Sequence, residues 1–393
     1  METVVIVGIL LALLFNFVNG LNDAANSIAT VVATRVLTPL QAVGMAAFFN
    51  MVGPFIFTTV VAKTIGKGIV DSGFLTTDVI MLGLVASVSW IFISSWAGIP
   101  ISASHALVGG LMGSAVAFAG LSAILWPSSA LVLHTILLIL AGGLAGAFIF
   151  VMAARHKNED GWMIFAVLGA LCGIAVVIPA GVITGLLPIT GILAIIIFIV
   201  VSPILGMIAA YIIGMGVIRF FRNAASRTMN PLFRRLQLLS AAFYSVGHGS
   251  NDAQNAMGII TALLVAAGIL TEFIVPAWVI IISGLAIALG TFLGGWRVVE
   301  TMGTKITRLR PYQGFCAETG GGIVLAFVTA FGVPVSTTHA ISGSIMGVGA
   351  TRGYSAVKWG MVRRIVVAWV LTIPLTAGFA FLTFLLYRAV LGF

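Results

Sequence analysis

The sequence predicts an all-α polytopic membrane protein made of two homologous repeats. Of the 393 residues, 61% are hydrophobic and only 7% are charged, and the mean hydropathy is +1.20. A soluble domain of this composition could not cover its surface against water, so soluble classes are excluded. Apolar runs of membrane length fill the chain, and a polar motif inside the first run returns in the second half.

The first copy of that motif lies in residues 15–26, FNFVNGLNDAAN. Its polar side chains recur every three or four residues and so share one face of a helix; they are Asn16, Asn19, Asp23 and Asn26. The second copy is YSVGHGSNDAQNA, in which each counterpart lies 229 positions later, as Asp252 does relative to Asp23. The counterparts are Ser245, His248, Asp252 and Asn255. Because a carboxylate at membrane depth is costly, this pair predicts a functional site.

The first expected element is a helix over 3–34, broken near Gly20, because glycine one turn before the carboxylate lets a membrane helix unwind around a ligand. Spans follow at about 40–62 and 76–98. Residues 100–120 begin with proline and hydroxyl side chains, which favours a re-entrant half-helix over a lipid-facing span. Three more spans are expected at about 130–153, 162–184 and 190–213.

The predicted organisation is a first repeat over 1–215, a connection over 216–237 and a second repeat over 238–393. The connection contains no acid and five arginines, namely Arg219, Arg222, Arg227, Arg234 and Arg235. We therefore expect it to be cytoplasmic, since basic residues stay on that side of the membrane. The net charge of +9 lies in such short connections, so it sets orientation in the bilayer and does not indicate nucleic acid.

The second repeat is expected to follow the order of the first. It begins with a helix at about 238–267, broken at Gly247 and Gly249, and continues with spans at about 273–295 and 312–331. A hairpin led by proline starts at 334. The last apolar stretch, about 357–391, is expected to form two elements interrupted at Pro374.

The second hairpin is also a copy of the first. GIPISASHALVGGLMG at 98–113 aligns without a gap with GVPVSTTHAISGSIMG at 332–347, and half of the positions are identical. Duplicated halves are typical of secondary transporters, and by analogy with these we expect the two repeats to be inverted in the membrane.

The two polar stripes predict a cation site. Asparagine in a membrane helix ordinarily joins helices by hydrogen bonds, but two copies of N-D-x-x-N around a buried carboxylate favour a ligand. The carboxylates supply charge and the amides supply neutral oxygens, as in alkali-cation sites. The expected sodium ligands are Asn22, Asp23, Asn26, Asn251, Asp252 and Asn255.

The tips of the two hairpins predict an oxyanion site. Proline with serine or threonine at a helix start presents free N–H groups, hydroxyls and the positive end of the helix dipole. These groups bind a tetrahedral oxyanion without arginine, although ordinary capping of a short helix would use the same residues. The expected anion-binding residues are Ser102, Ala103, Ser104, Ser336, Thr337 and Thr338, together with Gln254.

Three further ionisable residues are candidates for coupling or gating. His105 and His339 either relay protons or fasten their hairpins by hydrogen bonds. Glu318 could bind a cation, gate a path or pair with a basic residue. Its counterpart, 234 positions earlier, is Leu84, so the two halves are not chemically equivalent.

Two pairs of segments resemble the paired signatures of the inorganic phosphate transporter (PiT) family, whose members couple phosphate uptake to sodium or protons. They are GLNDAANSIAT with PISASHALVG, and GSNDAQNAMG with PVSTTHAISG; KITRLRPYQGFCAE resembles a further family segment. The resemblance covers nearly the whole chain and implies an inverted-repeat transporter with its substrate at the repeat interface. It implies roles for Asp23, Asn26, Asp252, Asn255, Ser102, Ser104, Ser336, Thr337 and Thr338. Family members often carry glutamate where this chain has Asn50, which leaves the number of coupled ions open.

The resulting hypothesis is a multi-pass plasma-membrane symporter that imports inorganic phosphate, with sodium as coupling ion and no organic cofactor. Phosphate and two aspartates repel one another at low dielectric unless cations bind with them. Proton coupling and a sulfate permease on the same scaffold are alternatives; the hydroxyl protons of phosphate, which can donate to aspartate, favour phosphate. An intramembrane protease is disfavoured, because the sequence contains no GxGD, HExxH or GxSG. A channel, and assembly as a homodimer, are left open.

Overall fold

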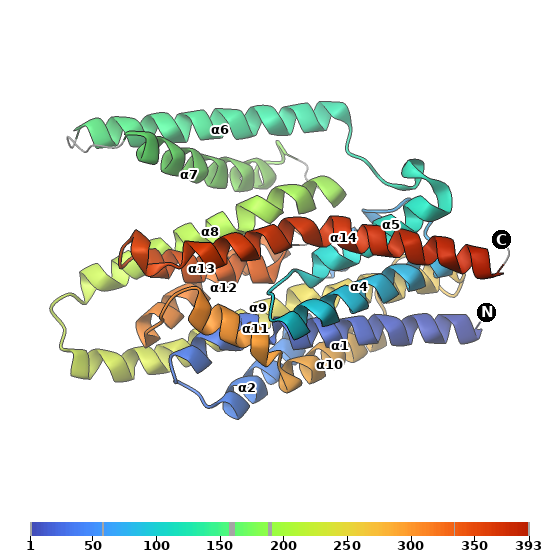
Figure 1. Cartoon of the computed structure of the whole chain (residues 1–393), viewed down its shortest axis with the longest axis horizontal. Coiled ribbons are helices and arrows are strands. Elements are labelled where there is room, and N and C mark those ends of the chain that lie inside the picture. Colours follow the sequence, from blue (N-terminus) through green and yellow to red (C-terminus); the bar gives the residue numbers. More distant parts are fainter. Residues whose placement is uncertain (1, 57–58, 157–161, 188–190, 334, 392–393) are drawn as a thin grey trace.

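A computed structural model describes the whole chain except residues 1, 57–58, 157–161, 188–190, 334 and 392–393. The prediction of an all-α membrane protein is confirmed. The described residues form helices and a single isolated bridge between Val70 and Ile124. Six helices are long and apolar enough to cross a membrane, or up to eight if each bent helix pair counts as one span. Figure 1 shows most of these helices lying along one common direction.

The helices follow the predicted order. Those of the first half are α1 (Glu2–Ala33), α2 (Pro39–Val52), α3 (Val60–Lys67), α4 (Thr77–Ala97), α5 (Ala103–Ala119), α6 (Ser129–His156), α7 (Trp162–Ile183) and α8 (Gly191–Phe220). Those of the second half are α9 (Ser226–Ala266), α10 (Ala277–Leu293), α11 (Trp296–Glu300), α12 (Pro311–Ala330), α13 (Thr337–Ala350) and α14 (Trp359–Leu391). Helix therefore extends well into the range 216–237, and residues 221–225 link α8 to α9.

The breaks expected in the two motif helices are absent, because α1 and α9 are continuous over 32 and 41 residues. The glycines have a different use. A Cβ at Gly20 would collide with the backbone of Ile287 on α10, and one at Gly249 would collide with the backbone of Asn50 on α2. Glycine thus lets helices approach closely, and the motif helices keep their own hydrogen bonds.

Bends occur in the helices that follow each motif helix. The span expected at 40–62 is divided into α2, a short 3₁₀ turn (Gly53–Phe55) and α3; residues 57–58 lie outside the described part. In the second half, α10 is followed at an angle of 66° by α11 and a π-helical turn, Thr301–Lys305. The discontinuities therefore lie beside the motif helices and not within them.

The interruption expected at Pro374 is also wrong, since α14 is one helix with this proline inside it. Threonine hydroxyls near the proline bond backbone carbonyls of the same helix. Thr376 Oγ1 donates to the carbonyl of Thr372 at 2.6 Å, and Thr372 Oγ1 donates to that of Ala368 at 2.7 Å. Membrane helices tolerate proline when neighbouring groups satisfy the backbone around it.

The two hairpins, α4–α5 and α12–α13, are exchanged between the halves. Helix α5 packs along α14 of the second half, whereas α13 packs along α8 of the first. Equivalent glycines make both contacts close: Gly109 meets the backbone of α14 at Ile373, and Gly343 meets that of α8 at Pro203. Pro334, at the start of the second hairpin, lies outside the described residues. Each half therefore buries a hairpin of the other.

The close contact at Gly20 yields a prediction about stability. Gly20→Val should lower the free energy of unfolding by about 1–3 kcal/mol, because overpacking forces α1 away from α10. Gly44→Val is the matched control, since a Cβ at that helical position meets nothing within 4 Å. Thermal unfolding in detergent measures both variants. Equal melting temperatures for the two variants would contradict the packing role of Gly20.

Candidate functional site

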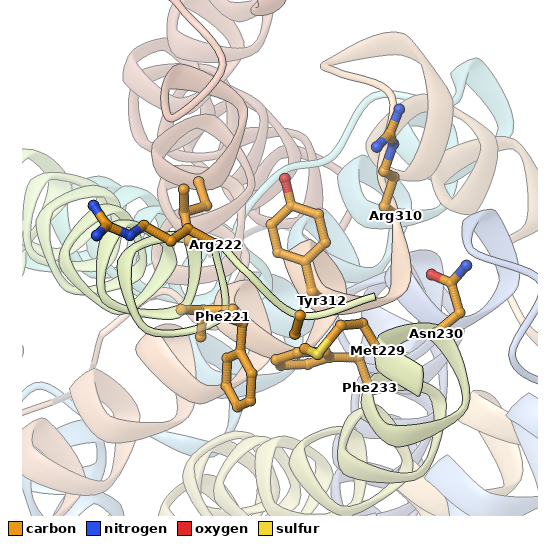
Figure 2. A pocket seen from close by; sticks show the side chains of 10 residues that line it. Phe221, Arg222, Met229, Asn230, Phe233, Arg310 and Tyr312 are labelled. Atoms are coloured by element: carbon orange, nitrogen blue, oxygen red, sulfur yellow. The ribbon is translucent and has the colours of Figure 1, made fainter. Parts of the chain in front are cut away.

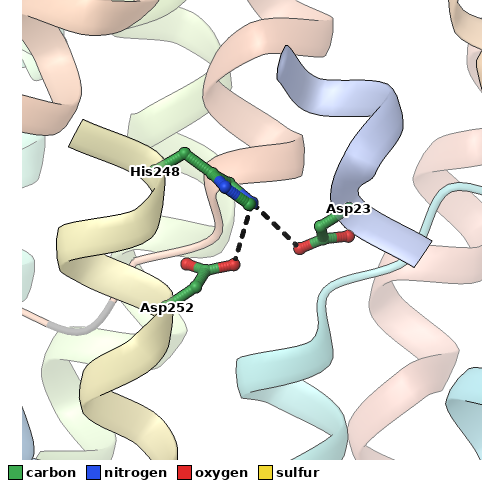
Figure 3. Close-up of side chains that lie close together, drawn as sticks. All are labelled: Asp23, His248 and Asp252. Atoms are coloured by element: carbon green, nitrogen blue, oxygen red, sulfur yellow. Dashed lines mark ion pairs between the residues drawn. The ribbon is translucent and has the colours of Figure 1, made fainter. Parts of the chain in front are cut away.

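Three side chains from the two motif helices meet where α1 packs against α9. Asp23 projects from α1, and His248 and Asp252 project from successive turns of α9 (Figure 3). The imidazole Nε2 of His248 lies 3.3 Å from Asp252 Oδ2 and 4.0 Å from Asp23 Oδ2. All three residues are at most 2% exposed. Their ligand-type atoms lie within 4.8 Å of one another, which is close enough to hold one metal ion.

The tip of the second hairpin completes this cluster. The Thr337 hydroxyl lies 3.2 Å from Asp252 Oδ2 and 3.5 Å from Asp23 Oδ2, and Thr338 Oγ1 donates to Asp23 Oδ1 at 3.2 Å. Thr338 also lies 3.1 Å from the carbonyl oxygen of Ile101 in the first hairpin. The two tips and the two aspartates therefore share one buried volume.

The outer asparagines of the two stripes pair across the halves. Asn26 of the first half donates to the hydroxyls of Thr337 and Thr338, at 3.2 Å and 3.0 Å. Its counterpart Asn255, in the second half, donates to Ser104 Oγ of the first hairpin at 2.8 Å. These two sets of bonds are equivalent under the duplication, and they hold each hairpin tip against the other half's motif helix.

The inner asparagines pair within their own halves. Asn22 accepts from Ser95 Oγ of α4 at 2.8 Å and donates to Asp23 Oδ1 at 2.6 Å. Asn251 donates to Thr329 Oγ1 of α12 at 3.0 Å. Ser95 and Thr329 are also duplicated positions, 234 apart (329 against 95). Each motif helix is thus bonded to both hairpins.

Several buried oxygens in this region have no hydrogen-bond donor among the described residues. They are Asn26 Oδ1, Asn251 Oδ1, Asn255 Oδ1 and Asp252 Oδ1. A buried acceptor without a partner loses its hydration without compensation, so such groups are rare unless a ligand satisfies them. Hard cations take carboxylate and amide oxygens of this kind. The chemistry of these oxygens fits a small cation of the sodium type.

The hairpin helices begin as predicted, with serine as the N-terminal cap. Ser102 Oγ accepts the backbone N–H of His105, and Ser336 Oγ accepts that of His339, both at 3.2 Å. The N–H groups of the first helical positions keep no intrahelical partner. They belong to Ala103, Ser104, Thr337 and Thr338. Both helices thus direct amide donors and the positive ends of their dipoles toward the region of the aspartates.

The two hairpin histidines lie behind the tips and contact each other. The rings of His105 and His339 meet edge to face with centroids 5.0 Å apart, and His339 stacks on Trp369 of α14 at 3.9 Å. Trp369 Nε1 in turn donates to the carbonyl of Pro100 at 3.0 Å. This arrangement fastens the two hairpins to one another. The coupling or gating role of both histidines stays a prediction.

Two predicted site residues lie away from the cluster. Gln254 follows Asp252 by two positions, which places it on the opposite face of α9. Its amide accepts from the backbone N–H of Ala62 on α3 at 3.1 Å and donates to the carbonyl of Ser250 at 2.9 Å. Its assignment to the anion stays a prediction without a contact to support it. The second such residue is Glu318.

Glu318 forms a separate buried site that joins three helices. Glu318 lies on α12 and is fully buried. Its carboxylate accepts a hydrogen bond from Thr30 Oγ1 of α1 at 2.5 Å and another from Gln237 Nε2 of α9 at 3.1 Å. Ser240 Oγ donates to its other oxygen. Thr30 lies two turns beyond Asp23 on the same face of α1, so the polar stripe continues from the central cluster to Glu318. Its coupling or gating role also stays a prediction.

Sequence reasoning placed His248 on the polar stripe but assigned it no part in the site. The ring is held by Asn50 of α2, whose Oδ1 lies 3.1 Å from Nδ1, while Asn50 Nδ2 donates to Thr291 Oγ1 at 2.9 Å. Because the Asn50 oxygen faces the ring, Nδ1 is the donor and Nε2 faces the aspartates. A signal existed in the sequence: His248 replaces Asn19 of the first copy and lies one turn before Asp252.

Spanning helices, crossed hairpins and a buried polar cluster between two related halves define a polytopic membrane transporter. The model of the phosphate transporter family matches residues 19–166 and 163–380. The chain therefore belongs to that family and is a phosphate transporter, not an enzyme, as the sequence predicted.

Named relatives and a solved structure agree with this assignment. A Rhizobium meliloti protein described as a probable low-affinity inorganic phosphate transporter is 44% identical over 370 residues, which cover 94% of this chain and 92% of the relative. A Bacillus subtilis protein of the same description is 35% identical over 94% of this chain and 92% of its own length. The solved structure of a sodium-dependent phosphate transporter matches with a TM-score of 0.69 and 27% identity, covering 98% of this chain and 99% of that one.

The position of His248 predicts a sodium-sensitive stability defect. His248→Gln removes the ring that lies between two buried carboxylates, so the variant without sodium should lose about 1–3 kcal/mol of unfolding free energy. Sodium should reduce the deficit, because a bound cation takes over that position. Melting temperatures with and without sodium measure the effect. His134→Gln, at an exposed position on α6, is the control, and equal behaviour of the two variants would exclude the bridging role.

Proposed function

We propose that this phosphate transporter imports phosphate together with sodium, both bound where the hairpin tips meet the two motif helices. One observation carries the proposal: Asp23 and Asp252, from different halves, are buried within hydrogen-bond distance of the same hydroxyl, that of Thr337. A site made from both halves changes when the halves move relative to one another. It can therefore face either side of the membrane in turn.

Sodium binding follows from the charge of this cluster. Two carboxylates face one imidazole, so with both carboxylates ionised the net charge is negative whatever the protonation of the ring. Burying an uncompensated charge costs several kcal/mol or more, which a cation with the free amide oxygens removes. The matching solved structure is described as sodium-dependent. Sodium is therefore proposed at Asp23 and Asp252, with Asn22, Asn26, Asn251 and Asn255 as oxygen ligands.

Phosphate binding follows from the donors on the two hairpins. The hydroxyls of Ser104, Thr337 and Thr338 and the first-turn N–H groups of α5 and α13 all lie at the same junction. The threonine hydroxyls are directed to the carboxylates. With cations on the carboxylates, the hydroxyls become free to donate to phosphate. Binding of the anion and binding of the cations thus favour each other, which is the thermodynamic basis of symport.

The repeats are proposed to be inverted. Figure 1 shows α1 running from right to left and its counterpart α9 running from left to right, so the two motif helices are antiparallel. The exchanged packing of α5 on α14 and of α13 on α8 is the pattern that two interlocked, oppositely oriented units produce. Labelling of single cysteines at equivalent loops of the two halves from each side of the membrane tests the inversion.

The direct test is transport by the purified protein in liposomes. An inward sodium gradient should accumulate radiolabelled phosphate above its equilibrium level, because the cations must enter with the anion. The measurement is repeated with an equal potassium gradient and with a proton gradient free of sodium. Equal accumulation in the proton gradient would replace sodium by protons as the coupling ion. Sulfate uptake that excess phosphate fails to inhibit would overturn the substrate assignment.

The paired sites are tested by removing one charge at a time. Asp23→Asn and Asp252→Asn keep the shape of each side chain but remove the charge that a cation offsets, so each should weaken sodium activation of phosphate binding by about tenfold or more. Asp78→Asn, at the start of α4 and away from the cluster, is the matched control. Phosphate binding is titrated with sodium in all three variants. A wild-type sodium dependence in either of the first two would exclude that aspartate as a cation ligand.

A further inference from the structure

A pocket of about 300 Å³ lies far from the central site, where the first half of the chain passes into the second. Helix α8, the link 221–225, α9 and the beginning of α12 form its walls. Three aromatic rings pack together inside it: the centroid of Phe233 is 5.6 Å from that of Phe221 and 6.2 Å from that of Tyr312. The interior is therefore largely apolar.

Two arginines stand at the mouth of this pocket. Figure 2 shows Arg222 on one side of the aromatic rings and Arg310 on the other. Both are exposed, and no carboxylate of the described residues lies within ion-pair distance of either. An apolar interior with two unpaired guanidinium groups at its entrance fits a ligand that has an apolar body and an anionic head.

The position of the pocket indicates where such a ligand comes from. Helix α8 has the length and hydropathy of a membrane span and ends at Phe220. In its last turn Ile218 and Phe220 are 37% and 82% exposed, so apolar side chains continue from the pocket to the lipid-facing surface. The excess of arginine in this region favours the cytoplasmic side. Basic pockets between helices at that surface bind the head groups of anionic lipids.

We propose that this pocket binds one anionic phospholipid of the cytoplasmic leaflet. Its phosphate group pairs with Arg222 and Arg310, and its glycerol and upper acyl carbons lie against Phe221, Phe233 and Met229. A small soluble anion would satisfy the arginines but would leave the aromatic walls exposed to water. A neutral phospholipid would fill the walls but would leave the net positive charge at the mouth uncompensated.

The lipid would act on the link between the two halves. Helix α8 packs along α13, and α13 carries Thr337 and Thr338 at its first turn. The same pocket contacts α9, the motif helix of the second half, through Met229 and Phe233. A molecule wedged there fixes the position of α8 relative to α9, so its presence should favour one arrangement of the halves.

Native mass spectrometry in a mild detergent tests the proposal. The wild-type protein is titrated with phosphatidylglycerol and, separately, with phosphatidylcholine of identical acyl chains. We expect one molecule of phosphatidylglycerol to be retained at a concentration at least about tenfold lower. The double variant Arg222→Ala/Arg310→Ala should lose this preference. Met229→Trp, which keeps both arginines but fills the pocket, should lose it as well.

The matched control removes two arginines at the same end of the molecule without touching the pocket. Arg363→Ala/Arg364→Ala changes exposed residues at the beginning of α14, and Figure 1 shows that end of α14 at the same, left-hand end of the molecule as the end of α8. It should bind phosphatidylglycerol like the wild type. Equal retention of the two lipids, an equal loss in the control, or displacement by millimolar glycerol 3-phosphate would each overturn the proposal. All variants must first show the wild-type size-exclusion profile.

Discussion

Two carboxylates buried at the contact of α1 and α9 are the constraint on which the arrangement of this transporter depends. A membrane interior makes such charges expensive. Here the Thr337 hydroxyl and the imidazole of His248 lie within 4.0 Å of both carboxylates, and the amide of Asn22 donates to Asp23. Those groups come from three separate helices, α1, α9 and α13, because no single helix face carries all of them. Three features bring these polar groups to the carboxylates. They are the crossing of the hairpins, the close approach of the helices and the line of polar residues on each motif helix.

The duplication explains why the bonds come in matched pairs. Asn26 binds the second hairpin as Asn255 binds the first, and Asn22 binds α4 as Asn251 binds α12. The chemistry departs from this symmetry at two places. His248 takes the position of Asn19, and Glu318 takes the position of Leu84. Residues outside the symmetry are where the two halves can respond differently.

Continuous motif helices impose a limit on how the site can move. Because α1 and α9 keep their backbone hydrogen bonds past the aspartates, the polar groups that they offer there are side chains on continuous helices. The helix ends that meet them belong to the hairpins, which His105, His339 and Trp369 join to one another. Motion of the hairpins against the motif helices would change the site without unwinding any helix. The pocket at the link between α8 and α9, with the lipid proposed for it, is placed to influence that motion.

The sequence by itself determined the membrane class, the order of the helices, the duplication and nearly all of the residues at the cluster. Hydropathy and the spacing of polar residues are local properties, so they can be recognised in the sequence alone. Only the tertiary structure decided which other residues these side chains contact. Gly20 looked like a hinge until Ile287, more than 260 positions away, was seen to occupy the space beside it. Likewise, only the structure brings His248 against both aspartates and Gln254 against Ala62 of α3. Those contacts depend on packing between distant segments, which no local pattern encodes.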